Sequence, residues 1–233
     1  MTKPGYQFDE MIHSGVDFAN PTGVEAYDRR QQRDPEAERQ LLAHLNVTGD
    51  DTLLEFGPGT GFLTLEAAKL CHKVYAADVS AAMLAHIRFR AAALGLDNIE
   101  LVHAGFLSYR HQGDPVDYVV SQFAFHHLPD FWKVQALTQI ADALKRGGTF
   151  YLRDVVFSFE PRASARYVEG WLDAYASATG EGWTRGDFEM HVRQKFSTYS
   201  WLLEAMLERS GFEIQKAEYD SLKVYAAYTC IRR

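Results

Sequence analysis

The sequence predicts an α/β protein with a doubly wound, mostly parallel seven-stranded sheet that ends in an antiparallel hairpin. Three observations support this prediction: apolar runs alternate with helical patterns over residues 51–157, a glycine-rich loop joins the first run to the first helix, and two further strands follow near the C-terminus. Alternating strands and helices imply parallel strands, right-handed crossovers and helices on both faces of the sheet. Ligands then bind at the carboxyl ends of the strands.

The individual elements can be placed in order along the chain. The expected strands are the apolar run that begins at Leu53, the runs Val74–Asp78, Asn98–His103 and Val116–Ser121, and the part of 144–157 that follows a turn at Gly147-Gly148. The expected helices are Thr60–Leu70, the alanine-rich Ala81–Leu96 with its stop signal at Gly95, and a helix that Pro129 and Asp130 open and that runs to about Leu144. The final hairpin is expected to pair Phe212–Tyr219 with Leu222–Cys230 around Asp220-Ser221.

The loop after the first strand, residues 57–61, reads GPGTG and follows an acid at Glu55. Its three glycines permit backbone conformations and a close ligand approach that a Cβ would obstruct. The dinucleotide fingerprint Gly-x-Gly-x-x-Gly needs its third glycine three positions after the second. Phe62 occupies that position here, so the spacing opposes a pyrophosphate site. Taken alone, the loop could also be a glycine-rich turn without a ligand.

An acid, Asp78, ends the second strand about twenty residues beyond the loop. A carboxylate only accepts hydrogen bonds and can receive both hydroxyls of a ribose, so this position suits ribose binding. In the alternative interpretation, Asp78 would only help to cap the helix that starts near Ala81. With the loop upstream, we expect the ribose role.

The pattern Glu55-x-Gly57-x-Gly59-x-Gly61 resembles the first motif of the class I S-adenosylmethionine (SAM)-dependent methyltransferases, which have a Rossmann-like fold. The resemblance covers residues 51–157. VVSQFAFHHLPD and LKRGGTFYLRD resemble the fourth- and fifth-strand motifs of the small-molecule enzymes, with Arg146 in place of a usual proline. More loosely, STYSWLLEAMLERSGFEI resembles the helix before their last hairpin. The resemblance implies SAM as cofactor, S-adenosylhomocysteine (SAH) as product and a small-molecule methyl acceptor.

One departure from this family concerns the adenine. The family usually places an acid after the third strand, where it meets the adenine amino group, but this chain reads His-Ala-Gly-Phe over 103–106. We expect backbone amides around Gly105 and Phe106 to hold the adenine, with Val79 and Met83 on its faces; Phe106 could instead point into the core. The complete set of expected cofactor-binding residues is Glu55, Gly57, Pro58, Gly59, Gly61, Asp78, Val79, Met83, Gly105, Phe106 and Gln122.

The chemistry expected of the protein is mainly positioning, because the sulfonium of SAM is already an electrophile. A base is needed only if the acceptor must lose a proton. His126 and His127 follow the fourth strand and are the candidates, with Asp154 after the fifth strand to orient a base or the substrate. Each histidine could instead be structural, as a helix cap or below the cleft. The sequence has no metal-ligand spacing among its histidines and cysteines, so no metal is expected.

We expect one domain over residues 1–233: an N-terminal lid segment (1–35), a cofactor-binding core (51–157), a helical lid insertion (158–201), and a final helix and hairpin (202–233). Aromatic residues are frequent in both lid segments, which suits an apolar or aromatic acceptor. These rings could also pack the lid onto the core or form a homodimer contact. Two other functions stay open: a catalytically idle SAM-binding regulatory protein and a nicotinamide-dependent oxidoreductase.

Composition limits the partners. A net charge of −7 and a pI near 5.7 oppose the broad basic surface that nucleic-acid binding requires. The chain has no apolar run of the roughly 18 residues that span a bilayer, and its first residues lack the apolar stretch of a signal peptide. Cys71 and Cys230 are expected to be buried thiols of a cytoplasmic protein without membrane association.

Overall fold

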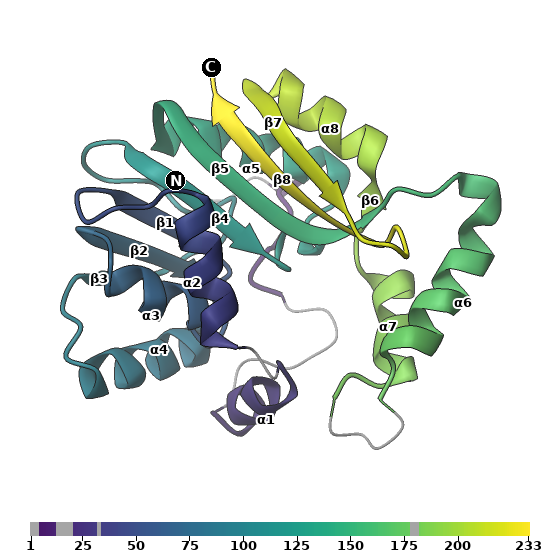
Figure 1. Ribbon diagram of the computed structural model, residues 1–233, viewed down its shortest axis with the longest axis horizontal. Coiled ribbons are helices and arrows are strands. Elements are labelled where there is room, and N and C mark those ends of the chain that lie inside the picture. The colour runs from purple at the N-terminus through teal and green to yellow at the C-terminus, as the bar shows by residue number, and fades with distance from the viewer. Residues whose placement is uncertain (1–4, 13–20, 32–33, 178–181) are drawn as a thin grey trace.

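The computed structural model describes residues 5–12, 21–31, 34–177 and 182–233 (Figure 1). Parts of the expected N-terminal lid segment, and residues 178–181 of the lid insertion, lie outside these ranges. The strands are β1 (Thr52–Phe56), β2 (Lys73–Asp78), β3 (Ile99–His103), β4 (Val116–Gln122), β5 (Leu144–Phe157), β6 (Thr198–Tyr199), β7 (Phe212–Tyr219) and β8 (Tyr225–Arg232). The helices are α1 (Pro21–Gln31), α2 (Pro35–His44), α3 (Phe62–Ala68), α4 (Ala81–Ala93), α5 (Asp130–Ala143), α6 (Ser164–Tyr175), α7 (Arg185–Gln194) and α8 (Ser200–Arg209). Short 3₁₀ turns cover Phe125–His127 and Pro161–Ala163.

The described strands form one sheet in the order β3-β2-β1-β4-β5-β8-β7, and the short β6 pairs with β5 off this path. Strands β1 to β5 are mutually parallel, whereas β8 is antiparallel to both β5 and β7. The predicted α/β fold with a C-terminal antiparallel hairpin is therefore confirmed. The order reverses between β1 and β4, and open α/β sheets bind ligands at such a switch point.

Helices cover both faces of the sheet because its central strands are apolar on both sides. Neighbouring residues of a strand point to opposite faces. Leu53 accordingly packs in the cluster beneath α2 and α3, and Leu54 packs in the cluster beneath α5 and α8. A third, smaller cluster around Trp171 joins α6 to the end of β5 and the last hairpin. The lid helices α6 and α7 thus have their own apolar contacts, and Figure 1 shows them set apart from the helices of the main core.

Two expected turns differ in detail. The glycine pair at 147–148 is an irregularity inside β5, where the pairing of β4 with β5 jumps from Val116–Leu144 to Tyr118–Thr149. The last strand begins three residues later than expected because the Asp220 carboxylate accepts hydrogen bonds from the amides of residues 222, 224 and 225. This widens the hairpin turn.

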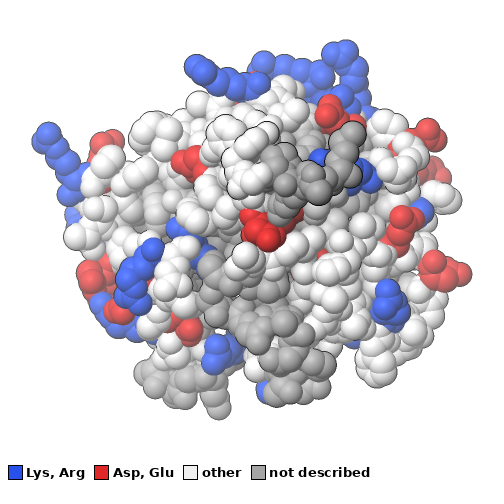
Figure 2. Space-filling view, turned by 180° about the vertical axis from the view of Figure 1, so that it is seen from behind, with Lys and Arg blue, Asp and Glu red and all other residues white. Residues whose placement is uncertain are grey.

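Several properties predicted from composition can be compared with the structure. Cys71 and Cys230 are buried free thiols, and burial raises the pKa of each to about 12. On the face seen in Figure 2, acidic and basic side chains are interspersed. None of the helices in the described ranges is both long and apolar enough to cross a membrane.

Candidate active site

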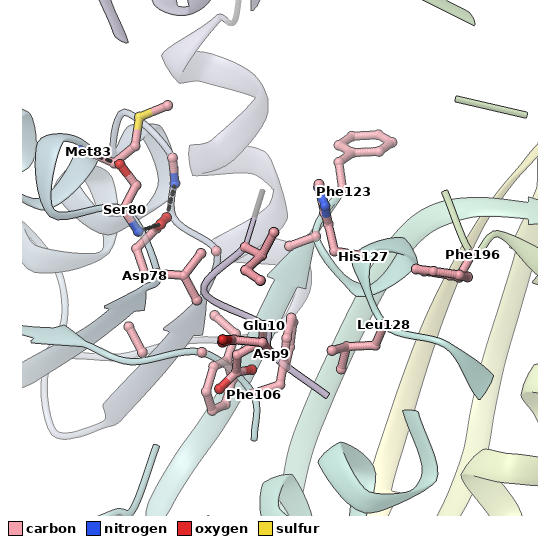
Figure 3. Close-up of a pocket in the computed structure, with 18 of the residues that line it drawn as sticks. Asp9, Glu10, Asp78, Ser80, Met83, Phe106, Phe123, His127, Leu128 and Phe196 are labelled. Carbon is pink, nitrogen blue, oxygen red and sulfur yellow. Dashed lines mark hydrogen bonds between the residues drawn. The ribbon is translucent and has the colours of Figure 1, made fainter. Parts of the chain in front are cut away.

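The glycine-rich loop borders a cavity of about 370 Å³ at the carboxyl ends of β1 and β2, which we call the loop cavity (Figure 3). All three glycines of the loop have positive φ, as L side chains rarely do. A Cβ on Gly57 would stand 2.4 Å from the Cβ of Ala124, and one on Gly61 would stand 2.8 Å from Cγ1 of Ile87 in α4. Gly57 and Gly59 line the cavity, whereas the missing Cβ of Gly61, at the start of α3, leaves room for Ile87 of α4.

Asp78 lies at the rim of the loop and joins it to the second strand. Its Oδ2 accepts a hydrogen bond from the amide of Gly59 at 3.3 Å, and its Oδ1 accepts one from the amide of Ser80 at 2.8 Å. Burial raises the pKa of the Asp78 carboxyl to about 6, although these two amides act in the opposite direction. The carboxyl is therefore ionised at neutral pH and lines the loop cavity with acceptor capacity to spare.

Ser80, rather than Asp78, caps the helix α4. The hydroxyl of Ser80 accepts a hydrogen bond from the amide of Met83 at 3.1 Å, and Ser80 is the N-cap of α4. Asp78 in turn accepts from the amide of Ser80, as Figure 3 shows. The carboxylate thus keeps its place facing the cavity while the adjacent serine starts the helix.

The other expected cofactor residues divide into two groups. Val79, Met83, Gly105 and Phe106 line the loop cavity together with Gly57, Gly59 and Asp78. Phe106 also belongs to the core, because its ring stacks on that of Phe56 with centroids 4.8 Å apart. Its ring is therefore buried in the core, as in the alternative interpretation, although the residue also borders the cavity.

The remaining expected cofactor residues lie outside the cavity lining. Thr64 in α3 donates a hydrogen bond of 2.5 Å to the buried carboxylate of Glu55, which ties the first strand to the first helix. The side-chain amide of Gln122 donates a hydrogen bond of 2.8 Å to the carboxylate of Glu38 in α2. Pro58 and Gly61 shape the loop without lining the cavity.

His126 and Asp154 form a buried pair beneath the ends of β4 and β5. Nδ1 of His126 lies 2.5 Å from Oδ1 of Asp154, and the backbone amides of His126 and Val155 also donate to this carboxylate. Burial alone would raise the pKa of the Asp154 carboxyl, but the nearby His126 ring and these amides outweigh it and lower that pKa. We assign the proton between the two side chains to Nδ1, since an ionised carboxylate can only accept; Nε2 of His126 is then the free acceptor.

A second cavity of about 450 Å³ adjoins the loop cavity, and we call it the aromatic cavity. His126 lines it, and its walls carry the rings of Phe123, Trp171, Tyr175, Trp183, Phe188 and Tyr225. Three side chains line both cavities: Tyr27, Phe123 and His127. The aromatic side chains of the predicted lid insertion therefore meet those of the core beside the loop cavity.

The aromatic cavity also contains basic side chains. Nζ of Lys195 lies 3.3 Å from Nδ1 of His127, and burial lowers the pKa of this lysine to about 8. Burial lowers the pKa of His191 to about 3, so its ring is neutral and hydrogen-bonds to the hydroxyl of Ser197 at 2.7 Å. The guanidinium of Arg153 lies 5.2 Å from the centroid of the Phe123 ring. Among the described residues, no group of three or more His, Cys, Asp or Glu is arranged to hold a metal ion.

Several residues of this region were not found by sequence reasoning. The segment 5–12 contributes Asp9, Glu10 and Ile12 to the loop cavity, and Lys195 and Arg153 enter the aromatic cavity. No local pattern marks Asp9, Glu10, Ile12 or Lys195, whereas Arg153 stands beside the predicted Asp154 in the fifth-strand motif but carries no signal of its own. Ser80 could have been found, since a serine directly before an apolar helix is a typical N-cap.

Fold and site together define a class of protein. A parallel sheet with a switch point between β1 and β4, a positive-φ glycine loop without a dinucleotide spacing, and a buried acid at the end of β2 are the features of a SAM-binding transferase fold. The residues fit the cofactor: the loop has no Cβ where Gly57 and Gly59 face the cavity, and Asp78 offers an ionised acceptor there.

Comparison with known proteins agrees with this class. Residues 53–148 match the family described as methyltransferase domain. An uncharacterized methyltransferase of Geobacillus kaustophilus is 27% identical over 205 residues, which cover 85% of this chain and 89% of that protein. One from a Geobacillus species is 31% identical over 146 residues, or 63% of this chain and 66% of that protein.

Solved structures show the same fold. A SAM-dependent methyltransferase from Aquifex aeolicus superposes with a TM-score of 0.61 at 19% identity, covering 92% of this chain and 99% of that one. Magnesium protoporphyrin IX methyltransferase from Synechocystis, solved with bound SAH, gives a TM-score of 0.65 at 16% identity. The match covers 94% of this chain and 98% of that one. Over most of its length the chain is therefore similar to SAM-dependent methyltransferases, the class I family that its motifs resemble.

Proposed function

We propose that this protein transfers the methyl group of SAM to a small-molecule acceptor bound in the aromatic cavity, and that His126 acts as general base. The observation that carries this proposal is the common wall of the two cavities, to which Tyr27, Phe123 and His127 contribute. A cofactor in the loop cavity and an acceptor in the aromatic cavity would meet at this wall.

On the cofactor side, we assign the roles by the chemistry of each group. Gly57 and Gly59 leave room for the amino-acid and ribose parts of SAM, and Asp78 accepts hydrogen bonds from the ribose hydroxyls. Val79 and Met83 provide apolar surface for the adenine faces. Glu55, Gln122 and Gly61 act indirectly, by fixing the strand, the loop and the first helix.

On the acceptor side, the cavity favours a largely apolar, ring-containing molecule. Its aromatic walls resemble those of small-molecule sites in general, which are mostly apolar with a few placed polar groups. Arg153 and Lys195 add positive charge, so an acceptor with an anionic substituent would be accommodated.

When bound, SAM supplies an electrophilic methyl group on its sulfonium. The acceptor then needs a free lone pair, and His126 would take the acceptor's proton on Nε2 while Asp154 holds the ring through Nδ1. The Asp154 carboxylate would stabilise the resulting imidazolium. Holding acceptor and cofactor in line supplies most of the remaining rate enhancement, with about 7–11 kcal/mol available from proximity and orientation.

Two alternative functions are less well supported. A catalytically idle SAM-binding protein would have a lid that closes without an acceptor pocket, but a cavity of about 450 Å³ lies beneath α6 and α7. A nicotinamide-dependent oxidoreductase is opposed by the glycine spacing and by the methyltransferase relatives.

The test combines binding with a search for the acceptor. Calorimetric titration with SAM, SAH and NADH should give micromolar binding of both adenosyl ligands, none of NADH, and loss of binding in Asp78→Ala. Asp97→Ala, which removes an exposed acid outside both cavities, serves as the control. Ring-containing hydroxyl, amine and carboxylate compounds would then be incubated with SAM and the protein, with SAH formation followed by mass spectrometry. SAH binding without turnover of any compound class would favour the idle protein.

A further inference from the structure

The N-terminal segment places a carboxylate in the loop cavity, at the turn that follows β3. Oε2 of Glu10 accepts a hydrogen bond from the amide of Leu107 at 2.8 Å, and Oε1 accepts one from the amide of Ser108 at 2.7 Å. Glu10 is partly buried and lines the cavity, and Figure 3 shows it beside Phe106. Two backbone amides thus hold the side chain in one orientation although it lies almost a hundred residues away in sequence.

The Glu10 carboxylate occupies the space that a side chain at position 105 would take. A Cβ built on Gly105 would stand 2.4 Å from Oε2 of Glu10 and 2.5 Å from its Cδ. Gly105 has no positive φ that would explain the glycine. The same Cβ would also stand 2.7 Å from Cγ1 of Val79, so Glu10 and Val79 together leave no room for a side chain at this position. The loop after β3 lacks an acid of its own, and Glu10 supplies one at that place from another part of the chain.

A hydrogen-bond donor lies next to this acceptor. The amide N–H of Phe106, between Gly105 and the two amides that Glu10 occupies, donates to no group in the described part of the chain. Each carboxylate oxygen of Glu10 accepts one amide and has a lone pair left. An acceptor beside a donor, next to apolar surface from Val79 and Met83, matches one edge of adenine, where an exocyclic amine adjoins an unprotonated ring nitrogen.

We propose that Glu10 recognises the adenine of SAM by accepting a hydrogen bond from its exocyclic amine, while the Phe106 amide donates to the neighbouring ring nitrogen. The proposal rests on the SAM site proposed above and adds a specificity-determining residue to it. It also makes the segment 5–12 part of the cofactor site, so that cofactor binding and the placement of this segment are coupled.

The experiment compares two ligands with three variants. SAH and its inosine counterpart, in which a carbonyl oxygen replaces the amine and the ring nitrogen carries a proton, are titrated calorimetrically into the wild-type protein and into Glu10→Ala, Glu10→Gln and Glu208→Gln. Loss of a hydrogen bond to a charged group should weaken SAH binding to Glu10→Ala by about 10- to 100-fold. The inosine ligand has no exocyclic amine to donate to Glu10, so its binding to Glu10→Ala should weaken by less than threefold. Glu10→Gln retains one carbonyl acceptor and should fall between wild type and Glu10→Ala.

Glu208→Gln is the matched control, because it removes the same charge from an exposed position in α8 and should bind SAH as the wild type does. Thermal unfolding without ligand shows whether each variant is folded. If Glu10→Ala does not fold, the comparison of SAH with the inosine ligand is made on Glu10→Gln. Unchanged discrimination between SAH and the inosine ligand in the Glu10 variants would overturn the proposal. So would tighter SAH binding by Glu10→Ala, which would make Glu10 an obstruction of the cavity. Failure of the wild type to bind SAH would instead contradict the proposed function.

Discussion

The loop cavity and the aromatic cavity adjoin each other and share three side chains, but they are assembled from very different stretches of chain. Gly57, Gly59, Asp78 and three apolar wall residues of the loop cavity (Ala77, Val79 and Met83) come from residues 57–83, a single run of loop, helix, strand and helix start. The aromatic cavity draws mainly on positions from 123 to 225, in β5, α6, α7 and the last hairpin. A cofactor common to a whole class can be held by a local motif, whereas an individual acceptor is met by elements brought together only on folding.

If the two cavities have separate roles, changes in each should affect different measurements. The largest effect is expected for His126→Ala, which should lower kcat for a hydroxyl acceptor by about 10²- to 10⁴-fold while the Kd for SAH stays unchanged. The reason is that this change removes the base but leaves the loop cavity intact. Initial rates of SAH formation test it, with His72→Ala at an exposed position as control. A normal kcat in His126→Ala would mean that the acceptor is already deprotonated or uses another base.

The pH dependence of cofactor binding should come from the loop cavity alone. Because the pKa of Asp78 is about 6, protonation removes its ability to accept from both ribose hydroxyls as the pH falls. We expect the Kd for SAH to rise about tenfold between pH 7.5 and pH 5. Asp78→Asn should bind SAH weakly across this range and show no such rise. An equally steep pH dependence in Asp78→Asn would assign the titration to another group.

Because its pKa is raised, Asp78 should lower the free energy of unfolding of the ligand-free protein at neutral pH. A carboxyl whose pKa is raised in the folded state holds its proton more tightly there than in the unfolded chain. Its contribution therefore favours folding below about pH 4 and is lost as the pH rises through about 6. Asp78→Asn should raise the free energy of unfolding by about 1–3 kcal/mol at pH 7.5, and the gain should disappear near pH 4. Denaturant unfolding at the two pH values tests this, and Asp97→Asn should show no comparable gain.

The smallest effect is expected at the rim of the aromatic cavity. Trp183 contacts the ring of Tyr27 edge-on, with centroids 5.9 Å apart, and lines only the aromatic cavity. Trp183→Ala should raise the KM for a ring-containing acceptor by about 3- to 10-fold through loss of an aromatic contact. The Kd for SAH should not change. Trp201→Ala, at an exposed tryptophan outside both cavities, should leave both constants at their wild-type values.

The sequence predicted those residues of the candidate site that follow directly after a strand. Gly57, Gly59 and Asp78 were found because the turn after β1 and the end of β2 have local signatures. His126 and Asp154 were found by their positions after β4 and β5, but their contact at 2.5 Å follows from the pairing of those strands. The hydrogen bond between the two side chains could therefore be predicted only once the register of β4 and β5 was known.

Other residues could not have been found in this way. Glu10 reaches the turn after β3 from the N-terminal segment, and nothing around it in sequence distinguishes it from an exposed acid. Lys195 likewise enters the aromatic cavity from the C-terminal end of α7. Glu55 and Gln122 show the converse: their motif positions were recognised, but their polar groups bond to α3 and α2 rather than facing the cavity.

The sequence by itself determined the sheet, the glycine loop and the acid that follows it, because apolar periodicity, backbone freedom at glycine and strand ends are local properties of the chain. Only the tertiary structure decided which carboxylate lies after β3, which histidine is held by Asp154 and which side chains enclose the aromatic cavity. Those contacts join residues from 28 to almost 100 positions apart. They depend on strand order and helix packing, which no local pattern encodes.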